Sequence, residues 1–211
     1  MPRTFAWFCL LLWSGTLVSA QPRDPLEYVR ILESAERVRK LQVEKVIATL
    51  QVESGQFVAD LGAGSGLFSR LLAREVGPQG QVYAIDIDSE LLNHIEDTAK
   101  SAGLTNIVTV LASEFDPRIP EPVDLVLICD TLHDISNPDI YLRGLVRYLK
   151  PNARVAIIDY GNNWPARFEK NKYTVRQLDR WMSESGFMRK KTYSFLEDNF
   201  FVVYQNHSET E

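Results

Sequence analysis

Three glycines at alternate positions follow a short apolar run and precede an amphipathic stretch. They belong to the segment Asp60-Leu61-Gly62-Ala63-Gly64-Ser65-Gly66. Glycines at this spacing let the backbone turn sharply and approach a ligand closely. A helix that starts after them would offer free N–H groups to a negative group such as a carboxylate. The loop therefore predicts a ligand site, and the acid at its head, Asp60, favours a ligand that also carries an ammonium group.

A second acid, Asp86, ends the next apolar run and lies 20 residues after Gly66. At this spacing a carboxylate can bind the two hydroxyl groups of a ribose, and its charge strengthens both hydrogen bonds. A solvated acid or a helix cap is the alternative, but Asp88 and Ser89 suit the cap better than Asp86 does. The loop and Asp86 together predict a cofactor that contains a nucleoside.

The residue after the loop separates two kinds of cofactor. The dinucleotide fingerprint G-x-G-x-x-G needs a glycine at position 67, where this chain has leucine. The negative charge of Asp60 would also repel a pyrophosphate. S-adenosylmethionine (SAM) has a zwitterionic amino-acid tail, a ribose and no phosphate, so the pattern favours SAM over NAD. An NAD-dependent oxidoreductase is the less favoured alternative.

Polar residues that could act on a methyl acceptor follow two later apolar runs. They are Asp130-Thr131-Leu132-His133-Asp134 and Asp159-Tyr160-Gly161-Asn162-Asn163-Trp164. Methyl transfer from a sulfonium depends mainly on orientation, and a base is needed only if the acceptor keeps its proton. His133 is the best candidate for that base, because an imidazole titrates near physiological pH. The alternative, which the residues alone favour, is a structural histidine that orders the loop. No two histidines have the spacing of metal ligands, and no metal is expected.

The elements around these residues alternate between strands and helices. Strands are expected at 57–61, 81–85, 106–111, 123–129, 154–158, 188–193 and 199–204. Helices are expected at 25–50, 66–75, 89–102, 138–149 and 174–185. Strands joined through helices run parallel, whereas the last two share a short loop and must pair as an antiparallel hairpin. The pattern predicts an α/β fold with a doubly wound sheet, in which ligands bind beyond the carboxyl ends of the strands.

Four motifs in order resemble those of the class I SAM-dependent methyltransferases. They are the glycine loop at 58–66, the strand with its acid at 82–88, the apolar strand at 123–127, and the turn at 149–154. The turn departs from the family pattern L-K-P-G-G at Asn152 and Ala153, although asparagine tolerates the positive φ that such a turn requires. The resemblance implies a seven-stranded, mostly parallel sheet of order 3-2-1-4-5-7-6, with one antiparallel strand and helices on both faces.

The same resemblance implies a set of cofactor contacts. They are Asp60, Gly62, Ala63, Gly64 and Gly66 at the methionyl part of SAM, Asp86 at the ribose, Ile87 at the adenine, and Cys129 and Asp130 at the sulfonium. The family often has an acid after the third strand that binds the adenine amino group. Here Ser113 stands at that position and Glu114 one residue beyond, which leaves the adenine contact open.

Within the superfamily, the chain is similar to small bacterial methyltransferases related to the quinone- and arsenite-methylating groups. These commonly have a histidine in the loop after the fourth strand, where this chain has His133. The cysteines of an arsenite enzyme are missing, because Cys129 is the only cysteine after the leader. A small, lipophilic acceptor is therefore expected, with a SAM-binding protein that lacks catalysis as the alternative.

The composition and the first 20 residues predict how the chain is divided and where it is located. The 211 residues are 45% hydrophobic and carry a net charge of −5, so a nucleic-acid partner is not expected. Residues 1–20 combine one arginine, an apolar run and a small-residue ending, which is typical of a secretory signal, and the run is short for a membrane span. The expected division is a signal at 1–20, a helical segment at 21–50, the methyltransferase domain at 51–205 and a flexible tail at 206–211. Export to the periplasm or beyond is predicted, with a membrane-anchored or a cytoplasmic chain as alternatives.

Overall fold

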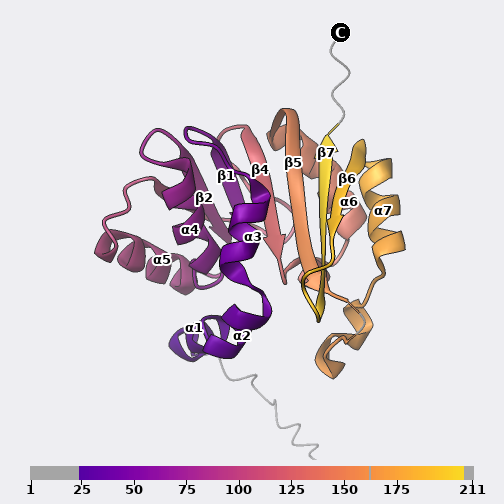
Figure 1. Cartoon of the computed structure of the whole chain (residues 1–211), viewed down its shortest axis with the longest axis horizontal. Helices are drawn as coiled ribbons and strands as arrows, with labels where there is room; N and C mark the ends of the chain where they lie inside the picture. Colours follow the sequence, from indigo (N-terminus) through magenta and orange to yellow (C-terminus); the bar gives the residue numbers. More distant parts are fainter. Residues whose placement is uncertain (1–23, 162, 207–211) are drawn as a thin grey trace, which may run out of the picture.

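The computed structural model describes residues 24–161 and 163–206. Within these ranges seven strands form one sheet in the order β3-β2-β1-β4-β5-β7-β6, which confirms the expected topology (Figure 1). The strands are β1 (Phe57–Leu61), β2 (Gln81–Asp86), β3 (Ile107–Leu111), β4 (Val123–Cys129), β5 (Leu149–Tyr160), β6 (Phe187–Tyr193) and β7 (Asn199–Asn206). The first five are parallel, and β7 runs antiparallel to both β5 and β6.

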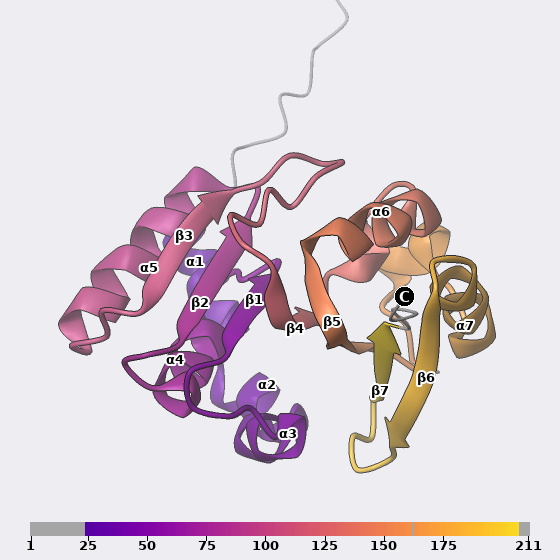
Figure 2. The same ribbon diagram turned by 90° about the horizontal axis from the view of Figure 1, so that it is seen from above.

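Helices cover both faces of the sheet (Figure 2). One face carries α3 (Val43–Leu50), α4 (Leu67–Val76) and α5 (Ser89–Ser101), and the other carries α6 (Pro138–Leu145) and α7 (Val175–Glu184). Each face has its own apolar core: Leu125 and Leu127 of β4 face α3 and α4, whereas Val126 and Ile128 face α6 and α7. Because successive side chains of a strand point to opposite faces, a strand covered on both sides must be apolar throughout, as β4 nearly is.

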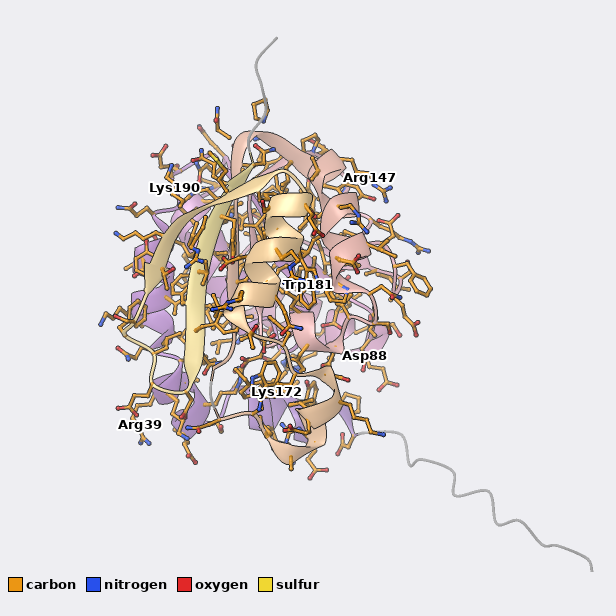
Figure 3. All side chains as sticks on the ribbon, turned by 90° about the vertical axis from the view of Figure 1, so that its right-hand side faces the viewer. Arg39, Asp88, Arg147, Lys172, Trp181 and Lys190 are labelled. Carbon is orange, nitrogen blue, oxygen red and sulfur yellow. The ribbon has the colours of Figure 1, made fainter. Side chains whose placement is uncertain are left out.

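The helix α7 closes the second core at the edge of the sheet. Thr174 and Gln177 form a reciprocal capping box at its N-terminus. Gly186, with a φ of 84°, follows its last turn and allows the chain to enter β6. Trp181, which Figure 3 labels on α7, is partly buried, and its ring centroid lies 5.3 Å from that of Tyr173. The caps and the packing of this one helix therefore position Tyr173, a residue of the candidate site.

The N-terminal segment is helical as expected but breaks into three pieces, α1 (Pro25–Leu32), α2 (Ala35–Lys40) and α3. Ser34 ends the continuity after α1, because its side chain accepts from the backbone N–H of Arg37 and caps a new helix. Gln42 then takes a left-handed conformation, with a φ of 44°, before α3 begins. Neither α1 nor α2 contains a buried residue, whereas α3 buries Val43, Val46, Ile47 and Leu50.

Several expected boundaries were wrong by a few residues. Of the two expected cap residues, Asp88 caps α5 and Ser89 is its first residue, because Oδ1 of Asp88 accepts from the backbone N–H groups of Glu90 and Leu91. The helix at 138–149 gives way after Leu145 to a 3₁₀ turn, η2 (Val146–Tyr148). The fifth strand begins at Leu149 rather than 154, since Leu149 already pairs with Val123 before a register shift.

Some predictions concern residues that the structure does not describe. The signal predicted at 1–20 and the end of the tail at 207–211 lie outside them, so export stays a prediction. Asn206, where the tail was expected to begin, is the buried last residue of β7. Of the helices that the structure describes, none is both long enough and apolar enough to cross a membrane.

The loops that follow β1, β2, β4 and β5 meet at the carboxyl edge of the parallel strands, and α1 and α2 lie over the same edge (Figure 1). Backbone hydrogen bonds tie these loops to neighbouring strands. The N–H groups of Gly62 and Ala63 both donate to the carbonyl of Ile85, at 2.8 and 2.9 Å, and that of Asp130 donates to Ile158 at 2.9 Å. Hydrogen bonds to the sheet therefore hold the start of the glycine loop and the start of the loop after β4 in place.

We expect Asn152 to lower the cost of the turn before the main part of β5. Its φ is 63°, a conformation that costs most residues about 1–2 kcal/mol and asparagine or glycine less. Asn152→Ala should therefore lower the free energy of unfolding by about 1 kcal/mol, whereas Asn152→Gly, the matched control, should leave it unchanged or raise it. Denaturant unfolding monitored by circular dichroism measures both. Equal losses in the two variants would mean that the asparagine side chain, and not the backbone angle, matters.

Candidate functional site

A cavity of about 540 Å³ opens at the carboxyl edge of the sheet. Its walls come from the loops after β1 to β5 and from α1 and α2. Of the residues predicted to bind the cofactor, those that line it are Asp60, Gly62, Ala63, Gly64, Asp86, Ile87, Ser113, Glu114, Cys129 and Asp130. His133 lines it too. Gly66 does not; it caps α4 in a left-handed conformation and packs against Ile95 of α5.

The glycine loop is packed too closely for side chains. An ideal Cβ on Gly62 would overlap with the side chain of Thr131, and one on Gly64 would lie 2.8 Å from Cδ1 of Leu32. Both glycines also have positive φ, at 75° and 55°. The loop therefore presents bare backbone to the cavity, which lets a ligand approach it closely.

Asp60 is buried at the base of the cavity. Its Oδ2 accepts a hydrogen bond of 2.6 Å from Oγ of Ser69, and no basic side chain within the described ranges forms an ion pair with it. Burial raises the pKa of Asp60 to about 6, although the hydroxyl of Ser69 favours the charged form. An ammonium group in the cavity would supply the missing positive charge, as predicted from the sequence.

Asp86 ends β2 at the opposite side of the loop. Its Oδ2 accepts from the backbone N–H of Gly64 at 2.9 Å and its Oδ1 from that of Asp88 at 3.0 Å. Burial raises its pKa, and these backbone hydrogen bonds oppose the rise. Each oxygen keeps a second lone pair, so the carboxylate can hold the glycine loop and a ribose diol together.

The far end of the cavity suits a flat base. Ile87 is 63% exposed at its rim, although a large apolar side chain is normally covered. Ser113 faces the cavity but its hydroxyl donates to the carbonyl of Asp116, at 3.4 Å, and Glu114 is exposed. Either residue can reach a ligand in this region, and the choice between them stays open.

The loop after β4 is joined to the N-terminal helices. Asp130 takes a φ of 51°, and its Oδ2 accepts from the guanidinium of Arg37 in α2 at 2.8 Å. Its Oδ1 accepts from Nδ2 of Asn199 at 2.9 Å. Burial raises the pKa of Asp130 in spite of the arginine. A second ion pair, Glu33 with Arg70 at 2.6 Å, also holds this helical cover in place.

His133 lies in the 3₁₀ turn η1 (Leu132–Asp134) that follows β4. Its side chain is 2% exposed, and its Nδ1 lies 2.8 Å from Oδ1 of Asp159, the penultimate residue of β5. The other oxygen of Asp159 accepts from the hydroxyl of Tyr173 at 2.9 Å. The histidine is therefore ordered by a buried carboxylate, which the sequence placed in a different loop without pairing the two.

Aromatic rings surround the imidazole. The ring centroids of Phe168, Tyr160 and Trp164 lie 4.2, 5.4 and 5.8 Å from that of His133. Phe168 belongs to the 3₁₀ helix η3 (Ala166–Asn171), which buries no residue and crosses the mouth of the cavity. We call these four residues the ring chamber; Tyr160, Phe168 and His133 line the cavity, whereas Trp164 packs against His133 and Tyr160 and does not line it.

Sequence reasoning missed part of this site. Arg37 was inside one predicted helix, and nothing in the helical pattern shows that the helix turns back over the sheet. Asp159 was noted only as a loop residue. Phe168 has no periodic neighbours that would place it. The one available signal was the edge rule for parallel sheets, which brings the ends of β4 and β5 together.

The residues present fit SAM. The buried carboxylate of Asp60 has no cationic partner in the described part of the chain, the glycine loop offers backbone without side chains, and Asp86 is free to accept from hydroxyl groups. The volume is within the usual range of about 300–1,000 Å³ for such sites. Cys129 is buried, and burial raises the pKa of its thiol, so it contributes an apolar wall rather than a nucleophile.

We predict that SAM binding weakens below pH 6 because of Asp60. The carboxyl group must be ionised to pair with the ammonium group, and its pKa of about 6 means that a proton has to leave at lower pH. The association constant should fall by up to about tenfold per pH unit below that pKa. Calorimetric titration with S-adenosylhomocysteine between pH 5 and pH 8 measures the effect.

In Asp60→Asn the affinity should be lower at pH 8, and the part of the pH dependence that Asp60 contributes should vanish. Asp97→Asn is the matched control, because Asp97 is an exposed acid of α5. Burial also raises the pKa of Asp86 and of Asp130, so both add to the pH dependence. The contribution of Asp60 is therefore the difference in pH dependence between the variant and the wild type. An unchanged slope in Asp60→Asn would show that the ammonium group binds elsewhere.

We expect Asp86→Ala to weaken SAM binding by about 1.5–3 kcal/mol, the scale of hydrogen bonds to a charged group. The loss should exceed that in Asp86→Asn, which keeps an acceptor for the Gly64 N–H. The same titration at pH 8 measures both. Equal affinities for wild type and Asp86→Ala would place the ribose away from β2.

The comparisons with known proteins agree with this geometry. Residues 52–199 match the family model described as a methyltransferase domain. The chain is 27% identical over 157 residues to the ubiquinone/menaquinone biosynthesis C-methyltransferase UbiE of Cupriavidus metallidurans, covering 72% of this chain and 63% of the relative. It is 31% identical over 121 residues to UbiE of Saccharophagus degradans, covering 56% of this chain and 49% of the relative. The chain thus spans less than two thirds of the length of these relatives.

Solved structures show the same fold. A SAM-dependent methyltransferase from Aquifex aeolicus superimposes with a TM-score of 0.76 at 27% identity, over 87% of this chain and 99% of that one. A SAM-dependent O-methyltransferase from Thermotoga maritima gives a TM-score of 0.62 at 18% identity, over 81% of this chain and 66% of that one. The second match, at its low identity, speaks for the fold alone.

Proposed function

Because the chain belongs to the class I SAM-dependent methyltransferases, we propose that it transfers the methyl group of SAM to a small, largely apolar ring compound. When bound, SAM supplies an electrophilic methyl group on a sulfonium. The observation that supports a ring-shaped acceptor is the ring chamber, which adjoins the methionyl end of the cofactor site. Cys129, Asp130 and Thr131 line the same cavity as the glycine loop and His133.

The walls of the chamber favour flat, apolar molecules. Tyr160 contacts both Trp164 and Phe168, with ring centroids 5.5 and 5.6 Å apart. Such rings bury a planar molecule well and contribute about 0.5–1.5 kcal/mol per ring pair beyond the area that they cover. Arg167 also lines the cavity and lies over the ring of Phe168, 4.5 Å from its centroid. It can attract an electron-rich or negatively charged acceptor to the mouth.

Two further observations point the same way. The UbiE relatives, at 25–31% identity, are named ubiquinone/menaquinone biosynthesis C-methyltransferases, and a quinone is a planar ring. The chain has a net charge of −5, which disfavours nucleic acid as the acceptor. If residues 1–20 direct export, as their sequence predicts, the acceptor is met outside the cytoplasm, and SAM must be supplied there.

The proposal is tested with the full chain, SAM and matched pairs of acceptors. The ring compounds are phenol, thiophenol and aniline, and the acyclic controls are hexanol, hexanethiol and hexylamine. Formation of S-adenosylhomocysteine should be faster with ring compounds, since only they can fill the chamber. Equal rates for rings and chains, or transfer to protein or RNA alone, would contradict a ring acceptor.

Phe168→Ala should raise the KM for ring acceptors about tenfold, because one wall of the chamber is lost. SAM affinity should not change, since none of the hydrogen bonds at the glycine loop or at Asp86 involves η3. Phe168→Leu keeps apolar volume without the ring and should lie between wild type and Phe168→Ala. If SAM affinity falls in both variants together with the affinity for the acceptor, η3 supports the cofactor instead.

A further inference from the structure

The two nitrogens of His133 are in different states. Nδ1 lies 2.8 Å from a carboxylate oxygen of Asp159, which can only accept, so Nδ1 carries the proton of the neutral ring. The lone pair is then on Nε2. That atom is buried and makes no hydrogen bond within residues 24–161 and 163–206. A buried polar atom without a partner costs about 1–3 kcal/mol, so a purely structural histidine would be expected to use both nitrogens.

Asp159 holds this tautomer in place. Its side chain is fully buried, and four donors surround the two oxygens. They are Nδ1 of His133, the backbone N–H groups of His133 and Tyr160 at 3.3 and 2.8 Å, and the hydroxyl of Tyr173. The carboxylate therefore cannot turn away, and the ring cannot flip without losing its partner. The same carboxylate would stabilise an imidazolium, as in other histidine–aspartate pairs.

The charges around the ring favour proton uptake. Burial alone would lower the pKa of His133, but the hydrogen bond and charge of Asp159 and the charges of Asp134 and Asp130 outweigh it, so the pKa is raised. The other titratable groups that face the ring are the phenols of Tyr160 and Tyr173, which stay protonated because burial raises their pKa. Arg167 on η3 is the nearby positive charge from the element that covers the ring.

We propose that His133 is the general base of the reaction and that the acceptor is a ring compound with an ionisable hydroxyl group. This inference rests on the proposed function, because it names the acceptor class of the ring chamber. Nε2 takes the hydroxyl proton, and the acceptor oxygen forms a bond to the methyl carbon while the C–S bond breaks with its electron pair going to sulfur. The positive charge of the sulfonium thus ends as a proton on His133.

The structure also provides an exit for that proton. Oδ2 of Asp134 lies 3.6 Å from Nε2, and its side chain is 60% exposed. The imidazolium would therefore lie beside a carboxylate that reaches solvent. Access for the acceptor requires Phe168 to move, since its ring lies against the imidazole. η3 buries no residue, so the contacts that this movement breaks are mainly those of the Phe168 ring with His133 and Tyr160.

His133→Asn is the sharpest test, because its amide can keep the hydrogen bond to Asp159 that Nδ1 makes and removes only Nε2. With phenol, kcat should fall by about 100-fold or more, while SAM affinity by calorimetry stays unchanged. In wild type, kcat should rise with pH through the raised pKa of His133 and then level off. In Asp159→Asn the rise should move to lower pH and the plateau should fall, because the anion that stabilises the imidazolium is gone.

Nuclear magnetic resonance gives a readout that needs no acceptor. The chain has three histidines, so the ring nitrogens of His133 can be assigned by replacing the other two, His94 and His207, and followed in a pH titration. The neutral ring of His133 should carry its proton on Nδ1 and titrate above the ordinary range. A neutral ring protonated at Nε2 would overturn the proposal, even if the variants fail to fold.

The remaining outcomes separate this inference from the proposed function. Methylation of thiophenol or aniline but not phenol, or a ring-carbon product formed equally by wild type and His133→Asn, overturns the base and keeps the ring acceptor. If no ring compound is methylated while SAM binds, both fail.

Discussion

The sheet grows outward from β1 in both directions, and this one constraint creates the site. The chain goes from β1 to β2 and β3 on one side, then returns to the other side of β1 as β4. The connections after β1 and β4 therefore leave the same edge towards opposite faces, into α4 and α6, and a space opens between them. Close packing at this point explains why Gly62 meets Thr131 with no room for a side chain.

Buried acidic side chains make that space negatively charged. Asp60, Asp86 and Asp130 are brought together by strand ends, and burial raises the pKa of each. Among the ion pairs of the described residues, Arg37 compensates only Asp130. A ligand with two positive groups, an ammonium and a sulfonium, relieves the remaining imbalance, whereas a pyrophosphate would worsen it. The electrostatics therefore select the cofactor as strongly as the glycine loop does.

The sequence predicted those features that depend on local pattern. The alternation of strands and helices, the glycine loop and Asp86 all follow from periodicity and spacing, and the sheet order from the resemblance. Features that depend on the path of the chain in space could not be predicted. Arg37 reaches Asp130 only because Ser34 starts a new helix, and His133 reaches Asp159 only because β4 ends in a left-handed residue and a 3₁₀ turn. Serine at position 34 is a common helix cap, but it does not show where the next helix points, and no residue type marks the break after β4.

The two halves of the cavity differ in what holds them. The cofactor half consists of strand ends whose backbones are bonded to neighbouring strands, so its shape is as stable as the sheet. The acceptor half is partly closed by η3, and the cavity as a whole is covered by α1 and α2, none of which buries a residue. Substitutions there alter the ring chamber at little cost to the fold. His133 is the exception, because it reaches the acceptor half while its partner Asp159 belongs to the central part of the sheet. The proposed base, held in this way, keeps its geometry while the walls around it change, so under this proposal the sheet fixes the chemistry and the cover selects the ring.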